Sequence, residues 1–152
     1  MTLAHSAPPI EARDLGAAMA AVRNGGLRVT AARRLLIEAL WEAEEPLSAE
    51  GLLERLGERS DLGSVYRNLE ALERLGLIRH VHLGHGPGLY SRAALGPREY
   101  LLCDSCGAHL AVDPSDLDEV RDVIYRRFSY EARFTHFPVA GLCPKCARER
   151  QR

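Results

Sequence analysis

Two pairs of cysteines are the residues of this chain best suited to chemistry. Cys103 and Cys106 form one Cys-x-x-Cys pair, Cys143 and Cys146 form a second, and 36 residues lie between the pairs. A two-residue spacer lets both thiolates of a pair approach one ion at about 2.3 Å, and four sulfurs complete a tetrahedral zinc shell. The spacing therefore predicts a structural zinc site made of all four cysteines.

The predicted zinc site is closed to catalysis. A zinc ion with four thiolate ligands has no open position for a substrate, and no cysteine is spaced with a general base. A thiol–disulfide site is the competing interpretation of Cys-x-x-Cys, but two pairs without a thioredoxin-like context favour metal. We therefore expect a protein that is not an enzyme and has no small-molecule substrate.

Composition favours a globular cytoplasmic protein. The chain has 152 residues, 46% of them hydrophobic, and a net charge of −1, so it can bury one core or two small ones. No apolar run reaches the length of a membrane span, and the N-terminus does not resemble a signal peptide. We expect a cytoplasmic location, no membrane partner, and reduced thiols that bind metal instead of forming disulfides.

Positive charge is concentrated in one segment. Four arginines and no acidic residue lie between Arg23 and Ile37, whereas the segment from Glu38 to Glu58 contains seven glutamates and one arginine. A DNA-binding protein with a net charge near zero needs a local basic surface. The asymmetry predicts one basic face and one acidic face.

The first part of the chain has the pattern of a helix-turn-helix. Helical spacing of apolar residues covers residues 10–23 and three further segments, for which the predicted N-caps are Thr30, Ser48 and Asp61. Pro46 ends the second of these four helices, and Gly76 ends the fourth. Extended runs at residues 77–83 and 89–92 flank a glycine-rich turn and predict a hairpin, the wing of a winged helix.

The pattern changes after a predicted hinge at residues 94–98. The second domain is expected to contain strands at residues 99–102 and 109–112, a helix that begins with a capping box of Ser115 and Asp118, and a strand at about 133–142. The prediction is an α+β fold. It comprises a winged helix-turn-helix domain at residues 1–93, with a flexible tail at 1–9, and a small α/β domain at 99–152 that contains the four-cysteine zinc site.

The start of the predicted recognition helix suits DNA. In a helix-turn-helix, the first residues of the second helix reach base edges, while flanking elements hold phosphates. Arg67 can donate two hydrogen bonds to guanine or hold a phosphate, and the Tyr66 ring can contact a thymine methyl group. The candidate DNA-binding residues are Arg28, Arg33, Ser64, Tyr66, Arg67 and Asn68.

These segments resemble the ferric uptake regulator family. The likeness rests on residues 27–33 (LRVTAAR), 47–50 (LSAE), 62–69 (LGSVYRNL) and 76–78 (GLI), together with the cysteine pairs, and spans roughly residues 26–146. It implies that the second domain mediates dimerisation, that a homodimer binds a palindromic double-stranded DNA operator, and that a metal ion is the corepressor. Two helices of a dimer reach half-sites about one DNA turn apart.

Several positions depart from the family's metal-sensing pattern. The histidine-rich run that usually precedes the first cysteine pair is replaced by residues 96–100. Ser91 stands where an acidic residue usually follows the wing aromatic, and Glu45 or Pro46 stands where a histidine usually precedes LSAE. The sensing site between the domains is therefore altered or lost.

The resemblance implies a second metal site within the second domain. Glu99, Asp118 and His136 fall at or near positions where relatives hold a metal, and two carboxylates with one imidazole suit Mn²⁺ or Fe²⁺, with Zn²⁺ as a further possibility. Each residue also has an ordinary interpretation. Glu99 is then a solvated strand residue, Asp118 is part of a helix cap, and His136 is a hydrogen-bonded strand histidine.

The wing contains an alternative set of regulatory metal ligands. His80, His82 and His85 lie close together in sequence, and His80 and His82 share a strand face because they are two residues apart. Glu45 is a candidate to complete this set. These histidines are otherwise solvated, or contact DNA phosphate when protonated.

The function that these patterns predict is metal-dependent repression of genes for metal uptake or homeostasis. The expected cofactors are a structural Zn²⁺ and a second divalent metal. Two alternatives remain open. One is a peroxide- or redox-responsive repressor of the same family, in which bound iron or a thiolate is oxidised. The other is a DNA-binding module whose zinc is structural and which senses no metal.

Overall fold

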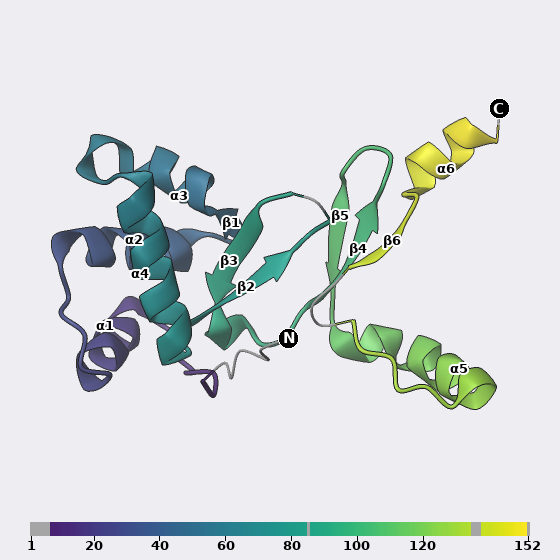
Figure 1. Ribbon diagram of the computed structural model, residues 1–152, viewed down its shortest axis with the longest axis horizontal. Coiled ribbons are helices and arrows are strands. Elements are labelled where there is room, and N and C mark those ends of the chain that lie inside the picture. The colour runs from purple at the N-terminus through teal and green to yellow at the C-terminus, as the bar shows by residue number, and fades with distance from the viewer. Residues whose placement is uncertain (1–6, 85, 135–137, 152) are drawn as a thin grey trace. The chain divides into compact units, whose positions relative to one another are not determined.

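The computed structural model describes residues 7–84, 86–134 and 138–151 (Figure 1). The chain forms two compact units. The first comprises Met1–Val81 with Pro87–Gly96, and the second comprises His82–Gly86 with Pro97–Arg152. Helices and two small sheets together give an α+β fold, as predicted. The first six residues of the predicted flexible tail lie outside the described residues.

The helices of the first unit begin at capping residues that the sequence identifies. They are α1 (Leu15–Asn24), α2 (Ala31–Glu42), α3 (Ala49–Leu56), which a 3₁₀ turn η1 (Gly57–Arg59) follows, and α4 (Leu62–Leu75). Thr30, Ser48 and Asp61 each accept a hydrogen bond from the backbone N–H three residues ahead, so these predicted caps are confirmed. Gly76 ends α4 with a φ of 85°, which a residue without a Cβ adopts easily.

The prediction that the first helix begins at residue 10 is wrong. Asp14 caps α1 by accepting a hydrogen bond from Ala17 N–H at 2.8 Å, so the helix begins only at Leu15. The preceding backbone has other partners: Ile10 N–H donates to the Gly76 carbonyl, and the Ala12 carbonyl accepts from the Trp41 indole. These tertiary hydrogen bonds replace the helical ones.

The predicted wing is present as part of a three-stranded sheet. Its strands are β1 (Leu47–Ser48), β2 (Ile78–His82) and β3 (Gly88–Arg92), in the order β1-β3-β2. β1, which the sequence did not predict, is antiparallel to β3, with Leu47 opposite Tyr90. A 3₁₀ turn η2 (Ala93–Leu95) follows β3, where the sequence predicted the start of a hinge.

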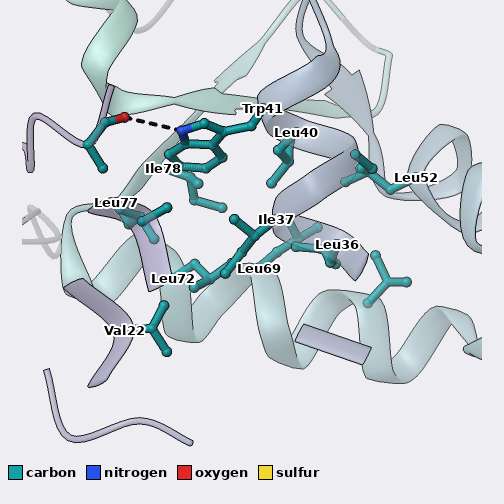
Figure 2. Close-up of a cluster of buried hydrophobic side chains, with 14 of the residues drawn as sticks. Val22, Leu36, Ile37, Leu40, Trp41, Leu52, Leu69, Leu72, Leu77 and Ile78 are labelled. Atoms are coloured by element: carbon teal, nitrogen blue, oxygen red, sulfur yellow. Dashed lines mark hydrogen bonds between the residues drawn. The ribbon is translucent and has the colours of Figure 1, made fainter. Parts of the chain in front are cut away.

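A hydrophobic core joins the four helices to the sheet (Figure 2). It takes Val22 from α1, Leu36, Ile37 and Leu40 from α2, Leu52 from α3, and Leu69 and Leu72 from α4, and all of these are fully or almost fully buried. The Trp41 indole closes the core and donates the hydrogen bond of 3.2 Å to the Ala12 carbonyl. Burial of this stripe of α4 orients the opposite face of the helix toward solvent.

The second unit is built on a sheet with β4 at its centre. Its strands are β4 (Glu99–Cys103), β5 (His109–Val112) and β6 (Val139–Gly141), in the order β5-β4-β6. β4 is antiparallel to β5 and parallel to β6. A 3₁₀ turn η3 (Pro114–Leu117) leads into α5 (Asp118–Phe128), and α6 (Pro144–Arg150) follows β6.

Two local predictions for this unit are corrected. The capping box uses Asp113 and Asp116 around η3, not Ser115 and Asp118, because Pro114 favours the first position of the turn. The predicted strand at residues 133–142 is shorter, since residues 131–134 are irregular, residues 135–137 lie outside the described residues, and β6 is the described part of this stretch that pairs with β4. Helix α6 was not predicted.

No helix in the described part of the chain is long and apolar enough to span a membrane.

The packing of the core predicts that two leucines of the first unit differ greatly in their contribution to the free energy of unfolding. Leu69 is completely buried, whereas Leu15 is 36% exposed. We expect Leu69→Ala to lower the free energy of unfolding by about 2–5 kcal/mol, because it leaves a cavity, and the control Leu15→Ala to lower it by about 1 kcal/mol or less. Urea denaturation followed by circular dichroism measures both. Equal losses in the two variants would contradict this placement of α4.

Candidate functional site

The four cysteines converge on one point, as the sequence predicts. Cys103 ends β4, Cys106 lies in the following turn, and Cys143 and Cys146 lie at the start of α6. Their sulfur atoms all lie within 4.8 Å of one another, and the Sγ atoms of Cys106 and Cys143 are 3.8 Å apart. A tetrahedron of sulfurs about 2.3 Å from zinc has edges of about 3.8 Å, so this donor set fits Zn²⁺.

Backbone hydrogen bonds hold the two cysteine pairs in place. Cys103 N–H donates to the Ala108 carbonyl and Gly107 N–H donates to the Cys103 carbonyl, which closes the first turn; Gly107 has a φ of 74°. Asp104 N–H donates to the Gly141 carbonyl at 2.8 Å, which joins this turn to the end of β6. The second pair is therefore brought to the first by the parallel pairing of β4 and β6.

The electrostatics of the cluster favour a bound cation. Backbone N–H groups of Cys143 and Cys106 lower the pKa of the Cys103 thiol to about 6, and the backbone of Cys146 lowers the pKa of Cys143. For Cys146 the Ser105 hydroxyl lowers the pKa, but the neighbouring Cys143 and Cys106 sulfurs outweigh it and raise the pKa to about 12. Cys146 therefore keeps its proton in hydrogen bonds with the neighbouring sulfurs, and a divalent ion bound to all four sulfurs would displace that proton.

Within residues 7–84, 86–134 and 138–151, these cysteines are the one group of three or more potential ligands close enough to hold an ion. None of the four forms a disulfide. The chemistry available to such a site is structural, because four protein ligands leave zinc no open position.

The predicted regulatory set of Glu99, Asp118 and His136 is arranged differently. The structure brings Glu99 and Asp118 to one place, but the guanidinium of Arg121 lies between them and hydrogen-bonds to both. His136 lies outside the described residues. A donor set with an arginine at its centre does not fit a metal ion, because the two positive charges repel each other.

The alternative set on the wing is only partly described. His80 Nδ1 pairs with the Glu73 carboxylate of α4, and its ring lies 5.9 Å from that of Tyr90. The side chains of His82 and Glu45 are exposed, and His85 lies outside the described residues. The His80–Glu73 pair links the wing to α4, which is a contact that the sequence did not reveal.

Three of the predicted DNA-binding side chains are exposed on the first unit. These are Arg28, just before α2, and Tyr66 and Arg67 in α4, whereas Ser64 is half-buried. The Tyr66 hydroxyl donates to the Glu50 carboxylate at 3.3 Å, and partial desolvation together with Glu50 raises the pKa of Tyr66. Glu50 lies in the LSAE segment, but the sequence pattern does not predict this contact with Tyr66.

Arg33 and Asn68 use their polar groups inside the protein. Asn68 is only 9% exposed, its Oδ1 accepts from Arg33 Nε at 2.9 Å, and its Nδ2 donates to the Ser64 carbonyl at 2.9 Å. Arg33 also donates to the Arg28 carbonyl. These bonds tie the first turn of α2 to α4, so in this geometry the two residues position the surface that Arg28, Tyr66 and Arg67 present.

A basic groove lies at the start of α2. A cavity of about 570 Å³ that is open to solvent lies here. It is lined by the segment between α1 and α2 and by the first turns of α2, including Arg23, Arg28 and Arg34. Arg34 is also paired with Glu38 at 2.8 Å. The groove lies in the segment where the sequence concentrates positive charge, and its arginines and exposed backbone suit phosphate oxygens.

Comparison with known proteins gives one consistent family. The model of the family described as ferric uptake regulator matches residues 24–136. The ferric uptake regulation protein of Bacillus subtilis is 27% identical over 132 residues, covering 82% of this chain and 89% of that protein. The zinc uptake regulation protein of Mycobacterium tuberculosis is 26% identical over 124 residues, covering 80% of this chain and 95% of that protein.

A solved structure supports the fold. The Helicobacter pylori ferric uptake regulator, which has three functional metal-binding sites, superposes with a TM-score of 0.67 at 20% sequence identity and covers 88% of this chain and 94% of that one. At this identity the likeness is evidence of the fold alone. It agrees with the arrangement of helices and two small sheets described above.

The cysteine cluster predicts one tightly held zinc per protomer. We expect Cys146→Ser to lose zinc to a mild chelator that leaves the native protein loaded, because an uncharged hydroxyl replaces one of four thiolates. Lys145→Ser is the matched control and keeps its zinc, since Lys145 is an exposed residue of the same turn of α6 and its ammonium group is not a zinc ligand. Elemental analysis after dialysis measures both. Equal retention by native protein and Cys146→Ser would contradict a four-sulfur site.

Zinc retention is expected to depend on pH in one direction. The pKa of Cys103 falls from its ordinary value of 9.0 to about 6, so the stability it contributes is complete above pH 9.0 and is lost as the pH falls through about 6. Bound zinc lowers the pKa further, so release is expected only below about pH 6. Dialysis at stepped pH followed by zinc analysis tests this, and release on raising the pH would contradict it.

Proposed function

Because the chain belongs to the ferric uptake regulator family, we propose that it is a metal-dependent transcriptional repressor that binds a palindromic operator as a homodimer. Members of this family are dimeric DNA-binding transcription regulators and not enzymes. The regulated genes are those of metal uptake or homeostasis, and the protein acts in the cytoplasm, where its operator lies. Its structural metal is Zn²⁺, bound by the four cysteines.

The observation that carries this proposal is the exposed face of α4. Core packing buries Leu69 and Leu72 on one side of the helix, and the other side presents Tyr66 and Arg67 to solvent. Asp61 caps the helix and so fixes where this face begins. A capped helix with an exposed arginine and tyrosine in its first turns suits the major groove, and the basic groove beside α2 suits the adjoining phosphates.

The second unit supports a homodimer. Its helix α5 has no buried residue and exposes Val120, Val123 and Phe128, the last at 71%. Leu110 of β5 and Val139 of β6 are exposed as well. Apolar side chains gathered on one small unit favour a protein–protein contact, and a second copy of the chain brings the second recognition helix that a palindromic operator requires.

The sensed metal is a divalent ion that exchanges more readily than the zinc. The relatives are named for ferric and for zinc uptake, which supports a transition metal as the signal. Of these, Fe²⁺ or Mn²⁺ suits nitrogen and oxygen ligands, with Zn²⁺ as a further candidate. Binding of this ion shifts an equilibrium between conformations that differ in their affinity for DNA.

One observation favours a second candidate function. Arg121 occupies the space between Glu99 and Asp118, so the described residues of the second unit offer no second set of metal ligands. A DNA-binding module whose zinc is purely structural is the second candidate. The two functions differ in whether added metal changes DNA affinity.

The DNA surface predicts a position-dependent effect of two arginines on α4. We expect Arg67→Ala to weaken binding to an operator selected from random duplexes by roughly 10- to 100-fold. The control Arg74→Ala, at the far end of the same helix, changes it by about twofold or less, since its exposed pair with Glu70 is a surface ion pair. Fluorescence anisotropy measures both affinities.

The same titrations on an unrelated duplex locate the Arg67 contact. A loss confined to the operator indicates a base contact, and an equal loss on both duplexes indicates a phosphate contact. Equal losses for Arg67→Ala and Arg74→Ala would contradict α4 as the recognition helix.

Metal dependence is tested on the native chain by two parallel measurements. Elemental analysis before and after mild chelation gives the metal content, and operator affinity is followed as Mn²⁺, Fe²⁺ or Zn²⁺ is restored. We expect one zinc per protomer to remain and one exchangeable ion to restore binding. If affinity is unchanged by every ion, the structural-zinc module replaces the metal-dependent repressor. If peroxide alone abolishes binding, the signal is oxidation.

A further inference from the structure

The guanidinium of Arg121 is the centre of a polar cluster in the second unit. Nη2 hydrogen-bonds to Oε1 of Glu99 in β4, and Nη1 donates to Oδ1 of Asp118 at 2.8 Å and to the Pro114 carbonyl at 2.7 Å. The ring of Phe134 lies 5.4 Å from the guanidinium carbon. One side chain of α5 thus contacts β4, η3 and the segment after α5.

The arrangement resembles ion coordination, with an arginine where the ion would be. Three oxygen atoms from three separate elements point at a single positive group, and two of them belong to carboxylates. The planar guanidinium offers five N–H donors in a fixed fork, so it can bind several oxygens at once. The hydrogen bond to Glu99 raises the pKa of Arg121 above its ordinary value, and the group stays charged.

We propose that Arg121 is a built-in cation that replaces a divalent metal ion between Glu99 and Asp118. The guanidinium ties the first residue of β4 to the start of α5 permanently, without depending on metal supply. One consequence rests on the proposed function: the exchangeable ion of a metal-dependent repressor would bind elsewhere. This inference concerns the second unit alone and does not depend on DNA binding.

Glu99 explains why a cation is needed at this position. Its side chain is only 1% exposed, and a buried carboxylate is costly unless a positive group or several hydrogen bonds compensate it. Its second oxygen, Oε2, has no hydrogen-bond partner in the described part of the chain. Without Arg121, Glu99 would have to take up either a proton or another cation.

The test exchanges the internal cation for an external one. Arg121→Met removes the charge at similar side-chain length, Arg121→Lys keeps it, and Arg126→Met is the matched control because Arg126 is an exposed arginine of the same helix. The full-length, zinc-loaded chain is used throughout. Thermal unfolding is followed with and without millimolar Mn²⁺, and isothermal titration calorimetry counts the Mn²⁺ ions bound.

We expect Arg121→Met to lower the unfolding temperature by roughly 10 °C without Mn²⁺, and Mn²⁺ to restore roughly half of this loss. The variant binds one Mn²⁺ more than the native protein, and Asp118→Asn in the same variant weakens that binding. Arg121→Lys and Arg126→Met show no additional Mn²⁺ site.

The native chain supplies the decisive comparison even if Arg121→Met does not fold. Asp118 is exposed, so Asp118→Asn leaves the core intact. If Arg121 holds the site, Asp118→Asn leaves the number and affinity of Mn²⁺ ions bound to the otherwise native chain unchanged. Loss of an Mn²⁺ ion in Asp118→Asn would overturn the proposal, because it would show that metal binds these carboxylates in the presence of Arg121. Operator affinity is not a readout here, so this outcome is distinct from failure of the proposed function.

Discussion

The convergence of four cysteine sulfurs on one point is the constraint on which the second unit depends. The sulfurs lie within 4.8 Å of one another, and although the Ser105 hydroxyl lowers the pKa of Cys146, hydrogen bonds with the neighbouring cysteine sulfurs raise it, so this thiol keeps its proton. A zinc ion bound by all four sulfurs would displace the remaining thiol protons and join the two cysteine pairs through four coordinate bonds. Only Tyr100, Cys103 and Cys146 are buried apolar side chains among its described residues, and small domains with thin cores commonly need such links. The first unit is stabilised differently, because a continuous apolar core from Val22 to Ile78 orients α4.

The sequence predicts correctly those features that depend on residues close together in the chain. The caps Thr30, Ser48 and Asp61 and the cysteine spacing depend on residues a few positions apart, so their geometry follows from the sequence. The start of α1 was misplaced because the tertiary hydrogen bonds of Ile10 and Ala12 replace helical ones. Strand β1 was missed because a two-residue strand carries no alternating pattern.

Arg121 shows most clearly which contacts cannot be predicted from the sequence alone. Its neighbour Asp118 could be paired with it from helical spacing, since the two are three residues apart. The pairing of Glu99 with Arg121 could not be predicted from the sequence, because β4 meets α5 only in the folded unit. The same two carboxylates suggest a metal site when the arginine is left out and a closed ion network when it is included. Which cation a carboxylate pair holds is thus decided by the third residue that the fold brings to it.

A permanent cation and an exchangeable one have different consequences for regulation. An ion that leaves can report its own concentration, because its occupancy changes the equilibrium between conformations. A guanidinium on α5 cannot leave, so it holds β4 and η3 to the helix at every metal concentration. A zinc ion in the cysteine cluster would have a similar role, since four thiolates hold zinc tightly. The second unit is thus built as a constant platform, and the response to a signal has to arise from ligands that are neither these cysteines nor the Glu99–Asp118 pair.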